Sequence, residues 1–209
     1  MTTAGKLSRL RGRLARGVRK IKRIAGYDRR RREAISRLVA EHHAVTMVDD
    51  VLPEKIPAGA QAVLGYVDGE WPTYAQVKKE HPGVPVLSMA VSADYDAHGL
   101  DIEKGNAKIE EAPGWLQRQF ATWAGEEWRP VLYIDKADAP ALIAVCSAAG
   151  IKRGRYRLFS ADWTYIPHIC SPESCGATFR ADATQYTNSP ATGGPDLSLC
   201  SAGFFPGRR

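Results

Sequence analysis

From residue 44 onward, short apolar runs typical of strands alternate with segments of helical periodicity. We expect strands at Ala44–Val48, Ala62–Val67, Val84–Val91, Gly99–Glu103, Pro130–Ile134 and Arg155–Ser160, then at Thr178–Tyr186 and Leu197–Cys200. Helices are expected at Thr73–Glu80, Ala112–Ala124 and Ala137–Ala149, the last one ended by Gly150. Repeated alternation of strands and helices favours a parallel sheet with right-handed crossovers, so the expected fold class is α/β.

Chain length decides between a closed and an open sheet. A complete eightfold β/α barrel usually needs about 250 residues, whereas about 165 follow residue 43. We therefore expect a shortened TIM-like β/α barrel, with helices after the early strands and bare strands near the end. An open doubly wound sheet is the structural alternative, but the glycine-containing turn at residues 65–69 lacks the G-x-G-x-x-G spacing of a phosphate loop.

Charge divides the chain into two domains, a basic amphipathic helical arm at residues 1–43 and a barrel at residues 44–209. Residues 1–40 carry fourteen Lys and Arg against two acidic residues, a net charge of +12, and the remainder carries fifteen against twenty-one, a net charge of −6. Apolar residues of the arm recur at steps of three and four, which places them on one helical face. They are Leu7, Leu10, Leu14, Val18, Ile21 and Ile24.

Three interpretations of this arm stay open. As a cationic amphipathic helix it would bind an anionic membrane or envelope surface. As a nucleic-acid or virion-assembly arm it would bind phosphates through its arginines. In the third interpretation it is a solvated tail or a helix packed on its own domain. Arginines interrupt every stretch that could form the apolar part of an export signal. We therefore expect no secretory signal, synthesis in the cytoplasm, and action at the cell envelope or in a phage particle. No window approaches eighteen uninterrupted apolar residues, so no transmembrane segment is expected either.

Acidic residues recur where the expected strands end. They are Asp49 or Asp50, Asp68, Asp101 with Glu103, Asp135 and Asp162, and Asp196 precedes the last strand. In a barrel these strand ends converge on one rim, where substrate sites form. Asp135 and Asp162 are better explained as N-caps of helices that follow them.

Asp101 and Glu103 are two residues apart on an expected strand, so both side chains point to the same side, with their Cα atoms roughly 6.6 Å apart. Leu100 and Ile102 then face the helical layer, and the two carboxyls face the barrel interior. Like charges crowded there raise one pKa, which leaves a protonated acid beside a carboxylate near neutral pH. Cleavage of a glycosidic bond requires such a pair, although the same carboxyls could bind a divalent cation.

These motifs, in this order, resemble the family 25 glycoside hydrolases, which are bacterial and phage muramidases together with a related group of actinobacterial glycoside-hydrolase-like domains. The matching segments are Val48-Asp49, Gly65-Tyr66-Val67-Asp68-Gly69, Leu100-Asp101-Ile102-Glu103, Ala183-Thr184-Gln185-Tyr186 and Asp196-Leu197-Ser198. They span about residues 44–205, and the arm lies outside the resemblance. The resemblance implies a short barrel of about five β/α units plus three strands, with lysozyme-like activity on the glycan chains of peptidoglycan and no cofactor.

The resemblance also implies a role for each acid. Glu103 would be the general acid, and Asp101 beside it would tune its pKa or steady the N-acetyl group of the sugar. Asp49 and Asp196 would stand in the same negatively charged cleft, with Asp50 as the rival of Asp49. The candidate substrate-binding residues are Tyr66, Tyr133, Trp163 and Tyr186 as sugar-stacking platforms, and Asp68 and Gln185 from the matching motifs.

Around Asp49 the chain departs from the family, whose usual Asp-Val-Ser in a Gly-Ile-Asp context is replaced by Met-Val-Asp-Asp-Val. The alternative to a glycosidase is therefore a non-catalytic barrel that binds glycan or a partner protein. Its arm would hold it to nucleic acid, to a membrane or within a virion.

The cysteines predict neither a metal site nor a catalytic thiol. Cys146 lies on an expected helix as a small buried hydrophobe, and Cys170, Cys175 and Cys200 are expected to be free thiols or to form one disulfide. The spacing of Cys170 and Cys175 does not fit a zinc knuckle, His168 is interpreted as a loop residue, and no paired Cys and His set completes a tetrahedral site. We therefore expect no metal, and the absence of Gly-x-Ser-x-Gly argues against a serine nucleophile.

Overall fold

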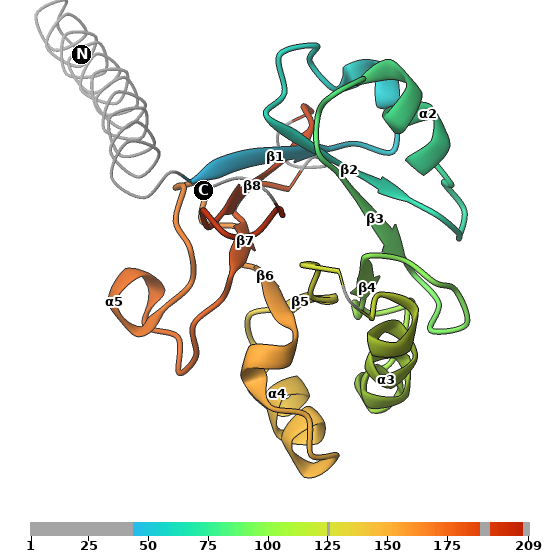
Figure 1. Cartoon of the computed structure of the whole chain (residues 1–209). Helices are drawn as coiled ribbons and strands as arrows, with labels where there is room; N and C mark the ends of the chain where they lie inside the picture. Colours follow the sequence, from blue (N-terminus) through green and yellow to red (C-terminus); the bar gives the residue numbers. More distant parts are fainter. Residues whose placement is uncertain (1–43, 125, 189–192, 207–209) are drawn as a thin grey trace, which may run out of the picture.

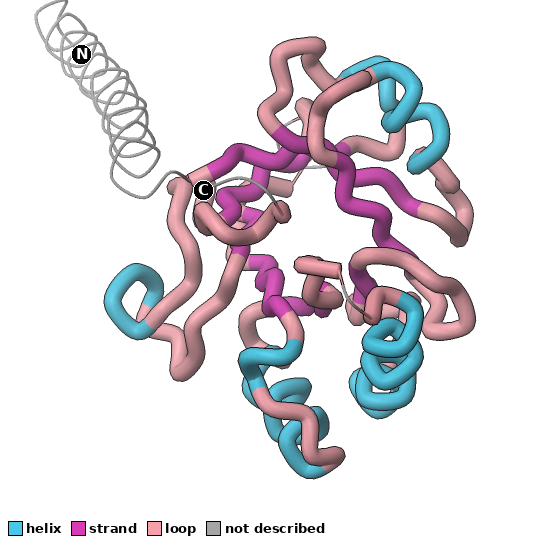
Figure 2. The backbone as a smooth tube through the Cα atoms, in the orientation of Figure 1, coloured by secondary structure: helices cyan, strands magenta, loops and turns pink. Residues whose placement is uncertain are grey.

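Eight short strands close into a ring in the computed structural model, which describes residues 44–124, 126–188 and 193–206 (Figures 1 and 2). The strands are β1 (Val45–Asp49), β2 (Ala62–Tyr66), β3 (Val86–Ala90), β4 (Gly99–Asp101), β5 (Val131–Asp135), β6 (Arg157–Ala161), β7 (Ala183–Gln185) and β8 (Asp196–Cys200). Their order around the ring follows the sequence. The expected α/β barrel is confirmed in place of the open sheet. The arm and the three interpretations of it lie outside the described residues.

The last strand runs against the others. Strands β1 to β7 pair in parallel with their sequence neighbours, whereas β8 pairs antiparallel with both β7 and β1. The expectation of parallel strands is therefore wrong for β8. Only ten residues separate Gln185 from Asp196, and a parallel crossover needs about a dozen or more. As a result, the first residue of β8 lies at the rim where the parallel strands end.

Helices α2 (Tyr74–Glu80), α3 (Ala112–Thr122) and α4 (Ala139–Ala148) lie outside the ring of strands (Figures 1 and 2). Both α3 and α4 carry a proline in their first turn, where a missing N–H breaks no helical hydrogen bond. Gly150, with a φ of +75°, follows the end of α4 as expected. Within the described part of the chain, helices of seven or more residues follow only β2, β4 and β5, so the count of five β/α units is not confirmed.

Several expected strands are shorter than the apolar pattern indicates, and β3 covers only Val86–Ala90 of the expected Val84–Val91. The strand expected at Gly99–Glu103 ends at Asp101, and the one expected at Thr178–Tyr186 is reduced to Ala183–Gln185. Before β7 the chain forms a loop that carries the one-turn helix α5 (Pro172–Cys175). Short 3-10 helices lie at Pro53–Lys55, Ile109–Glu111 and Arg153–Arg155.

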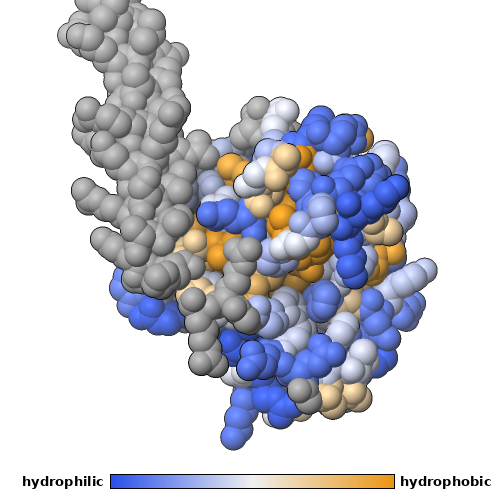
Figure 3. Space-filling model, turned by 45° about the horizontal axis from the view of Figure 1, so that its top comes forward, coloured by the Kyte–Doolittle hydropathy of each residue, from blue (hydrophilic) through white to orange (hydrophobic). Residues whose placement is uncertain are grey.

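Alternating side chains of the strands build two cores. Inward-facing residues pack inside the ring with Phe204 and Phe205, and they include Met47, Leu64, Leu87, Met89 and Phe159. Outward-facing residues pack against the helices, and this cluster includes Leu100, Leu132, Leu158, Trp115, Leu116 and Leu142. The surface seen in Figure 3 is largely hydrophilic, with apolar residues showing mainly near its middle. None of the helices in the described ranges is long and apolar enough to cross a membrane.

Gly65 lets α2 approach β2 closely. A Cβ atom at this position would lie 2.7 Å from Cα of Tyr74 and 3.0 Å from its backbone nitrogen. Because both atoms belong to the backbone, the helix would have to move. Gly65→Ala is therefore expected to lower the free energy of unfolding by about 1–3 kcal/mol. Urea unfolding would measure the loss.

Gly59→Ala is the matched control, because a Cβ atom there meets nothing within 4 Å. It should unfold at nearly the same urea concentration as the wild type. Equal stability of the two variants would show that α2 does not depend on the close approach at Gly65.

Candidate active site

The ends of β1 and β4 and the start of β8 bring predicted carboxyls to the same rim of the barrel. Asp49 ends β1 and lies opposite Asp196, the first residue of β8, while Asp101 ends β4. Burial raises the pKa of Asp49 well above its usual value, and the charges of Asp196, Asp50, Asp101 and Glu103 raise it further. The four predicted acids therefore share one electrostatic environment, although they lie far apart in the sequence.

The strand register distinguishes Asp49 from its rival Asp50. Asp49 is the last residue of β1 and pairs with Asp196, whereas Asp50 follows the strand. Oδ1 of Asp50 accepts the backbone N–H of Leu52 at 2.9 Å. Asp50 therefore stabilises the turn after β1, and Asp49 is the carboxyl that faces Asp196.

Glu103 reaches the rim by a route that differs from the expected one. β4 ends at Asp101, so Glu103 is not placed by strand alternation. Instead, Oδ1 of Asp101 accepts the backbone N–H of Glu103 at 3.0 Å, which closes a local turn of the kind that aspartate favours. Leu100 and Ile102 pack in the helical layer as predicted. Asp101 therefore holds the backbone that carries Glu103.

A cleft of about 280 Å³ opens beside Asp101 and Glu103, close to the volume of the smallest ligand pockets, about 300 Å³. Its other lining residues are Val51, Tyr66, Asp68, Glu70, Trp71, Val91 and Asn106. Carboxyls meet the exposed ring of Trp71 and the partly buried ring of Tyr66 in this cleft, which is a suitable surface for a polar ligand with apolar ring faces.

Burial is the main cause of the raised pKa values of Asp101 and Glu103 in this cleft. It raises the pKa of Asp101 to about 7, and the charge of Glu103 adds to the effect. Burial also raises the pKa of Glu103, the hydrogen bond from Tyr133 lowers it, and the charge of Asp135 raises it. Near pH 7, Asp101 is therefore partly protonated, and burial shifts Glu103 towards its protonated form.

A chain of hydrogen bonds joins Glu103 to Asp196 across the barrel. The hydroxyl of Tyr133 lies 3.0 Å from Oε1 of Glu103 and also makes a short hydrogen bond to Oε1 of Gln185. Nε2 of Gln185 donates to Oδ2 of Asp196 at 2.7 Å. Burial keeps the pKa of Tyr133 well above its usual value, so this residue remains a phenol.

The phenol of Tyr133 has one proton and two acceptors, Glu103 and Gln185. When Glu103 is ionised, it accepts that proton, and Gln185 loses the bond. When Glu103 is protonated, it can donate to the phenol oxygen, and the hydroxyl is free to donate to Gln185. The protonation of Glu103 is therefore linked to the direction of the Tyr133 hydroxyl.

Several predicted sugar-binding residues have other positions. Tyr133 is 5% exposed and its ring packs against Phe159 at 4.6 Å, and Tyr186 is 2% exposed and packs in a cluster with Leu199. Neither ring has a free face on which a sugar could stack. Gln185 is also buried, and it positions its neighbours through the hydrogen bonds above.

Of the remaining candidates, Tyr66 lines the cleft. Asp68 lines it too, but its two carboxylate oxygens accept the backbone N–H groups of Val91 and Ser92, so it ties together the loops after β2 and β3. Trp163 is 43% exposed and follows β6, outside the set of residues that line the cleft.

Trp71 and Asn106 were not predicted from the sequence. Trp71 is 50% exposed at the cleft, and a hydrogen bond from Asn106 lowers the pKa of Asp101. A tryptophan in a polar loop directly after an expected strand is a signal for Trp71, since such loops form the rim of a barrel. Asn106 has no comparable signal.

The structure also corrects the interpretation of Asp135, Asp162 and the cysteines. Asp138, not Asp135, occupies the N-cap position of α4, although its side chain makes no capping hydrogen bond there, and Asp135 raises the pKa of Glu103. Asp162 lies among side chains of His168, Cys170 and Cys175, with all four ligand-type atoms within 4.8 Å of one another. Sequence reasoning missed this cluster, because its fourth member is an aspartate and the loop after β6 brings the four residues together. All four cysteines are free thiols.

No family model matches the chain, and a search of curated proteins found no match. Among solved structures, the chain is similar to a muramidase from Acremonium alcalophilum, with 13% sequence identity and a TM-score of 0.44. The similarity covers 76% of this chain and 92% of that one. At this level of similarity the function has to be argued from the side chains.

Proposed function

We propose that the barrel is a glycosidase that cleaves the glycan chains of peptidoglycan, as an N-acetylmuramidase does, with Glu103 as the general acid. The observation that carries the proposal is the pair of buried Asp101 and partly buried Glu103 at the edge of an open cleft, with both pKa values raised. Asp49 and Asp196 stand in the same electrostatic environment. The segments that resemble the family 25 glycoside hydrolases contain these same four residues.

The chemistry needs one acid and at least one anion. Glu103 donates its proton to the glycosidic oxygen while the bond from that oxygen to the anomeric carbon breaks, and water supplies the hydroxyl of the new reducing end. Positive charge develops on the sugar ring, and a carboxylate at the rim, for which we propose Asp196, stabilises it. Asp101 positions Glu103 through the backbone hydrogen bond. Trp71 and Tyr66 offer ring faces to the sugar.

The burial of the acids favours an enzyme over a non-catalytic binding barrel. Burying carboxyls close to one another destabilises a fold, and a module that only binds a neutral sugar has no need of it. Groups with pKa values shifted by burial and by each other are typical of catalytic sites. A binding barrel would be served equally well by amides and hydroxyls.

The direct test is to incubate the purified full chain with peptidoglycan and to measure new reducing ends. The proposal expects reducing ends that increase with time and with protein concentration. Binding of the protein to peptidoglycan without new reducing ends would favour the non-catalytic barrel instead.

Tyr133→Phe tests the hydrogen-bond chain. The hydrogen bond from the Tyr133 hydroxyl lowers the pKa of Glu103, so its removal should raise that pKa. If Glu103 acts as the acid, the alkaline limb of the kcat/KM profile reports its deprotonation and should move to higher pH in the variant. The measurement is the pH dependence of reducing-end release.

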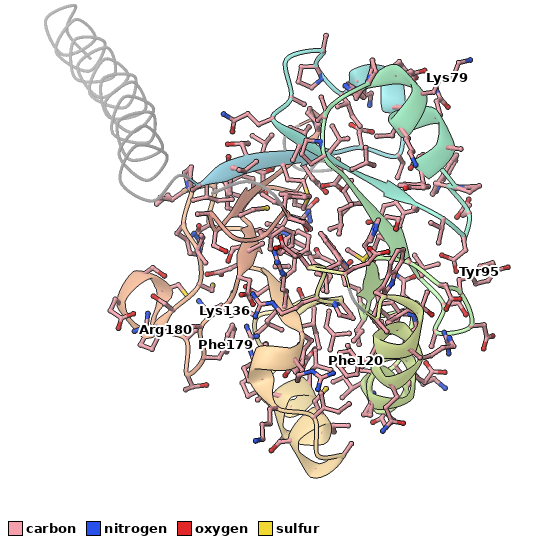
Figure 4. The ribbon with its side chains drawn as sticks, in the orientation of Figure 1. Lys79, Tyr95, Phe120, Lys136, Phe179 and Arg180 are labelled. Carbon is pink, nitrogen blue, oxygen red and sulfur yellow. The ribbon has the colours of Figure 1, made fainter. Side chains whose placement is uncertain are left out.

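Tyr95→Phe is the matched control, because Tyr95 is 53% exposed and points away from the barrel (Figure 4). Its profile should coincide with that of the wild type. An alkaline limb that stays in place or moves to lower pH in Tyr133→Phe would contradict the assigned role of Glu103.

A further inference from the structure

Away from the acidic cleft, four side chains of metal-ligand type converge between β6 and the loop that carries α5. Asp162 follows β6, His168 and Cys170 lie in the next stretch of loop, and Cys175 ends α5. Cys170 is fully buried and His168 is 8% exposed. We propose that these four residues bind one zinc ion that holds the β6–β7 connection in place.

The distances among three of the ligand atoms match those of a zinc tetrahedron. Sγ of Cys170 is 3.5 Å from Oδ2 of Asp162 and 3.5 Å from Nε2 of His168, and these last two atoms are 3.1 Å apart. Usual zinc bond lengths, about 2.3 Å to sulfur and about 2.0–2.2 Å to nitrogen or oxygen, place such atoms roughly 3.5 Å and 3.3 Å apart.

Cys175 requires a small adjustment. Its Sγ lies 2.8 Å from Sγ of Cys170, whereas two thiolates on one zinc ion lie about 3.8 Å apart. Cys175 is only partly buried and sits at the end of a helix of four residues. Rotation of its side chain can therefore supply the difference without moving the core.

The hydrogen bond at the far side of His168 orients the ring for metal binding. Nδ1 lies 2.7 Å from the carbonyl oxygen of Ile166. A carbonyl only accepts, so Nδ1 donates to it, and Nε2, which lies 3.1 Å from Oδ2 of Asp162, is the ring atom that faces the cluster. Metal-binding histidines usually donate their second N–H to a backbone carbonyl in this way.

Charge balance also suits a divalent cation. Two thiolates and one carboxylate carry three negative charges, so a zinc ion leaves one of them uncompensated. Nζ of Lys136 lies 2.9 Å from Oδ2 of Asp162 and 3.0 Å from the carbonyl oxygen of Cys175, so it supplies the missing charge. Lys136 is labelled in Figure 4 beside the segment that leads to α5.

Both the ligands and the fold favour zinc in a structural role. Thiolate and imidazole ligands in a tetrahedral arrangement select zinc over magnesium or calcium, and four protein ligands leave no open position for a substrate. Between β6 and β7 the chain has only the one-turn helix α5. The site would tie this loop to β7, since the backbone N–H of Cys170 already donates to Oγ1 of Thr184 at 2.8 Å.

The experiment uses the full chain, purified under reducing conditions, and measures bound metal by elemental analysis. We expect one zinc ion per chain. After removal of zinc with a chelator, added Co²⁺ should give the visible absorption of a tetrahedral site together with a charge-transfer band from thiolate. Removal of the metal should also lower the thermal midpoint of unfolding.

Cys175→Ser and His168→Gln should weaken Co²⁺ binding by more than the roughly 10–100-fold that is typical when an outer-shell partner is lost. Glu173→Gln is the matched control, because Glu173 lies on α5 but pairs with Arg180 at the surface. It should bind Co²⁺ as the wild type does.

Three results would overturn the proposal. They are a reduced wild-type protein that takes up no Co²⁺, a cobalt spectrum without thiolate ligation, and a Cys170–Cys175 disulfide that persists under reducing conditions. The wild-type spectrum decides the question even if a ligand variant fails to fold. None of these measurements depends on glycosidase activity.

Discussion

Replacing Glu103 by glutamine is expected to reduce the release of reducing ends from peptidoglycan by about 10²–10⁴-fold or more, since proton donation alone contributes that much. Glutamine keeps the size of the side chain and can still accept a hydrogen bond from Tyr133, but it has no acidic proton. The loss should appear in kcat, because the proton is needed in the transition state and not for binding.

Glu110→Gln is the control for this change, since Glu110 is exposed on the 3-10 helix Ile109–Glu111, outside the residues that line the cleft. It should release reducing ends as fast as the wild type. The assignment of Glu103 fails if Glu103→Gln keeps its activity while its circular dichroism spectrum and unfolding midpoint match those of the wild type.

Replacing Asp101 by asparagine is expected to stabilise the protein near neutral pH. Burial raises the pKa of Asp101 to about 7 in the native state, whereas an unfolded chain has an aspartate pKa of about 3.9. Below pH 4 both states are protonated, so burial of this group has no ionisation penalty there. Between about pH 4 and pH 7 the unfolded chain loses this proton while native Asp101 keeps it, so the free energy of unfolding falls. Above about pH 7 both states are ionised and the loss is complete.

Asparagine has no proton to lose, and its Oδ1 can still accept the N–H of Glu103. At pH 7–8, Asp101→Asn should therefore unfold with a free energy on the order of 2–4 kcal/mol higher than the wild type, at about 1.4 kcal/mol for each pKa unit. The difference should disappear towards pH 4. Urea unfolding between pH 4 and pH 8 measures it.

The control is Asp94→Asn, an exposed aspartate in the loop after β3, which should show no such trend. A variant that is less stable than the wild type at pH 7, or a difference that does not change with pH, would contradict the burial of an ionisable Asp101.

The sequence alone predicted the α/β barrel and most of its strands. The alternation of apolar runs with helical segments reflects local side-chain directions, and chain length then favours a closed barrel of limited size. The same local pattern predicted that Leu100 and Ile102 face the helices, and that Asp49, Asp101, Glu103 and Asp196 lie at one rim. Strand alternation and strand order account for these features except for two residues: Glu103 reaches the rim through a turn, and Asp196 reaches it through the antiparallel direction of β8.

Only the tertiary structure decided how these residues act together. The short connection turned β8 antiparallel and brought Asp196 opposite Asp49, and the early end of β4 placed Glu103 on a turn held by Asp101. Closure of the barrel turned Tyr133 from a predicted sugar platform into the link between Glu103 and Gln185. Asp162 likewise joined two cysteines and a histidine through the path of a loop. The physical reason is the same in each case: a hydrogen bond or ligand set between distant residues depends on non-local pairing and loop geometry, which local periodicity does not encode.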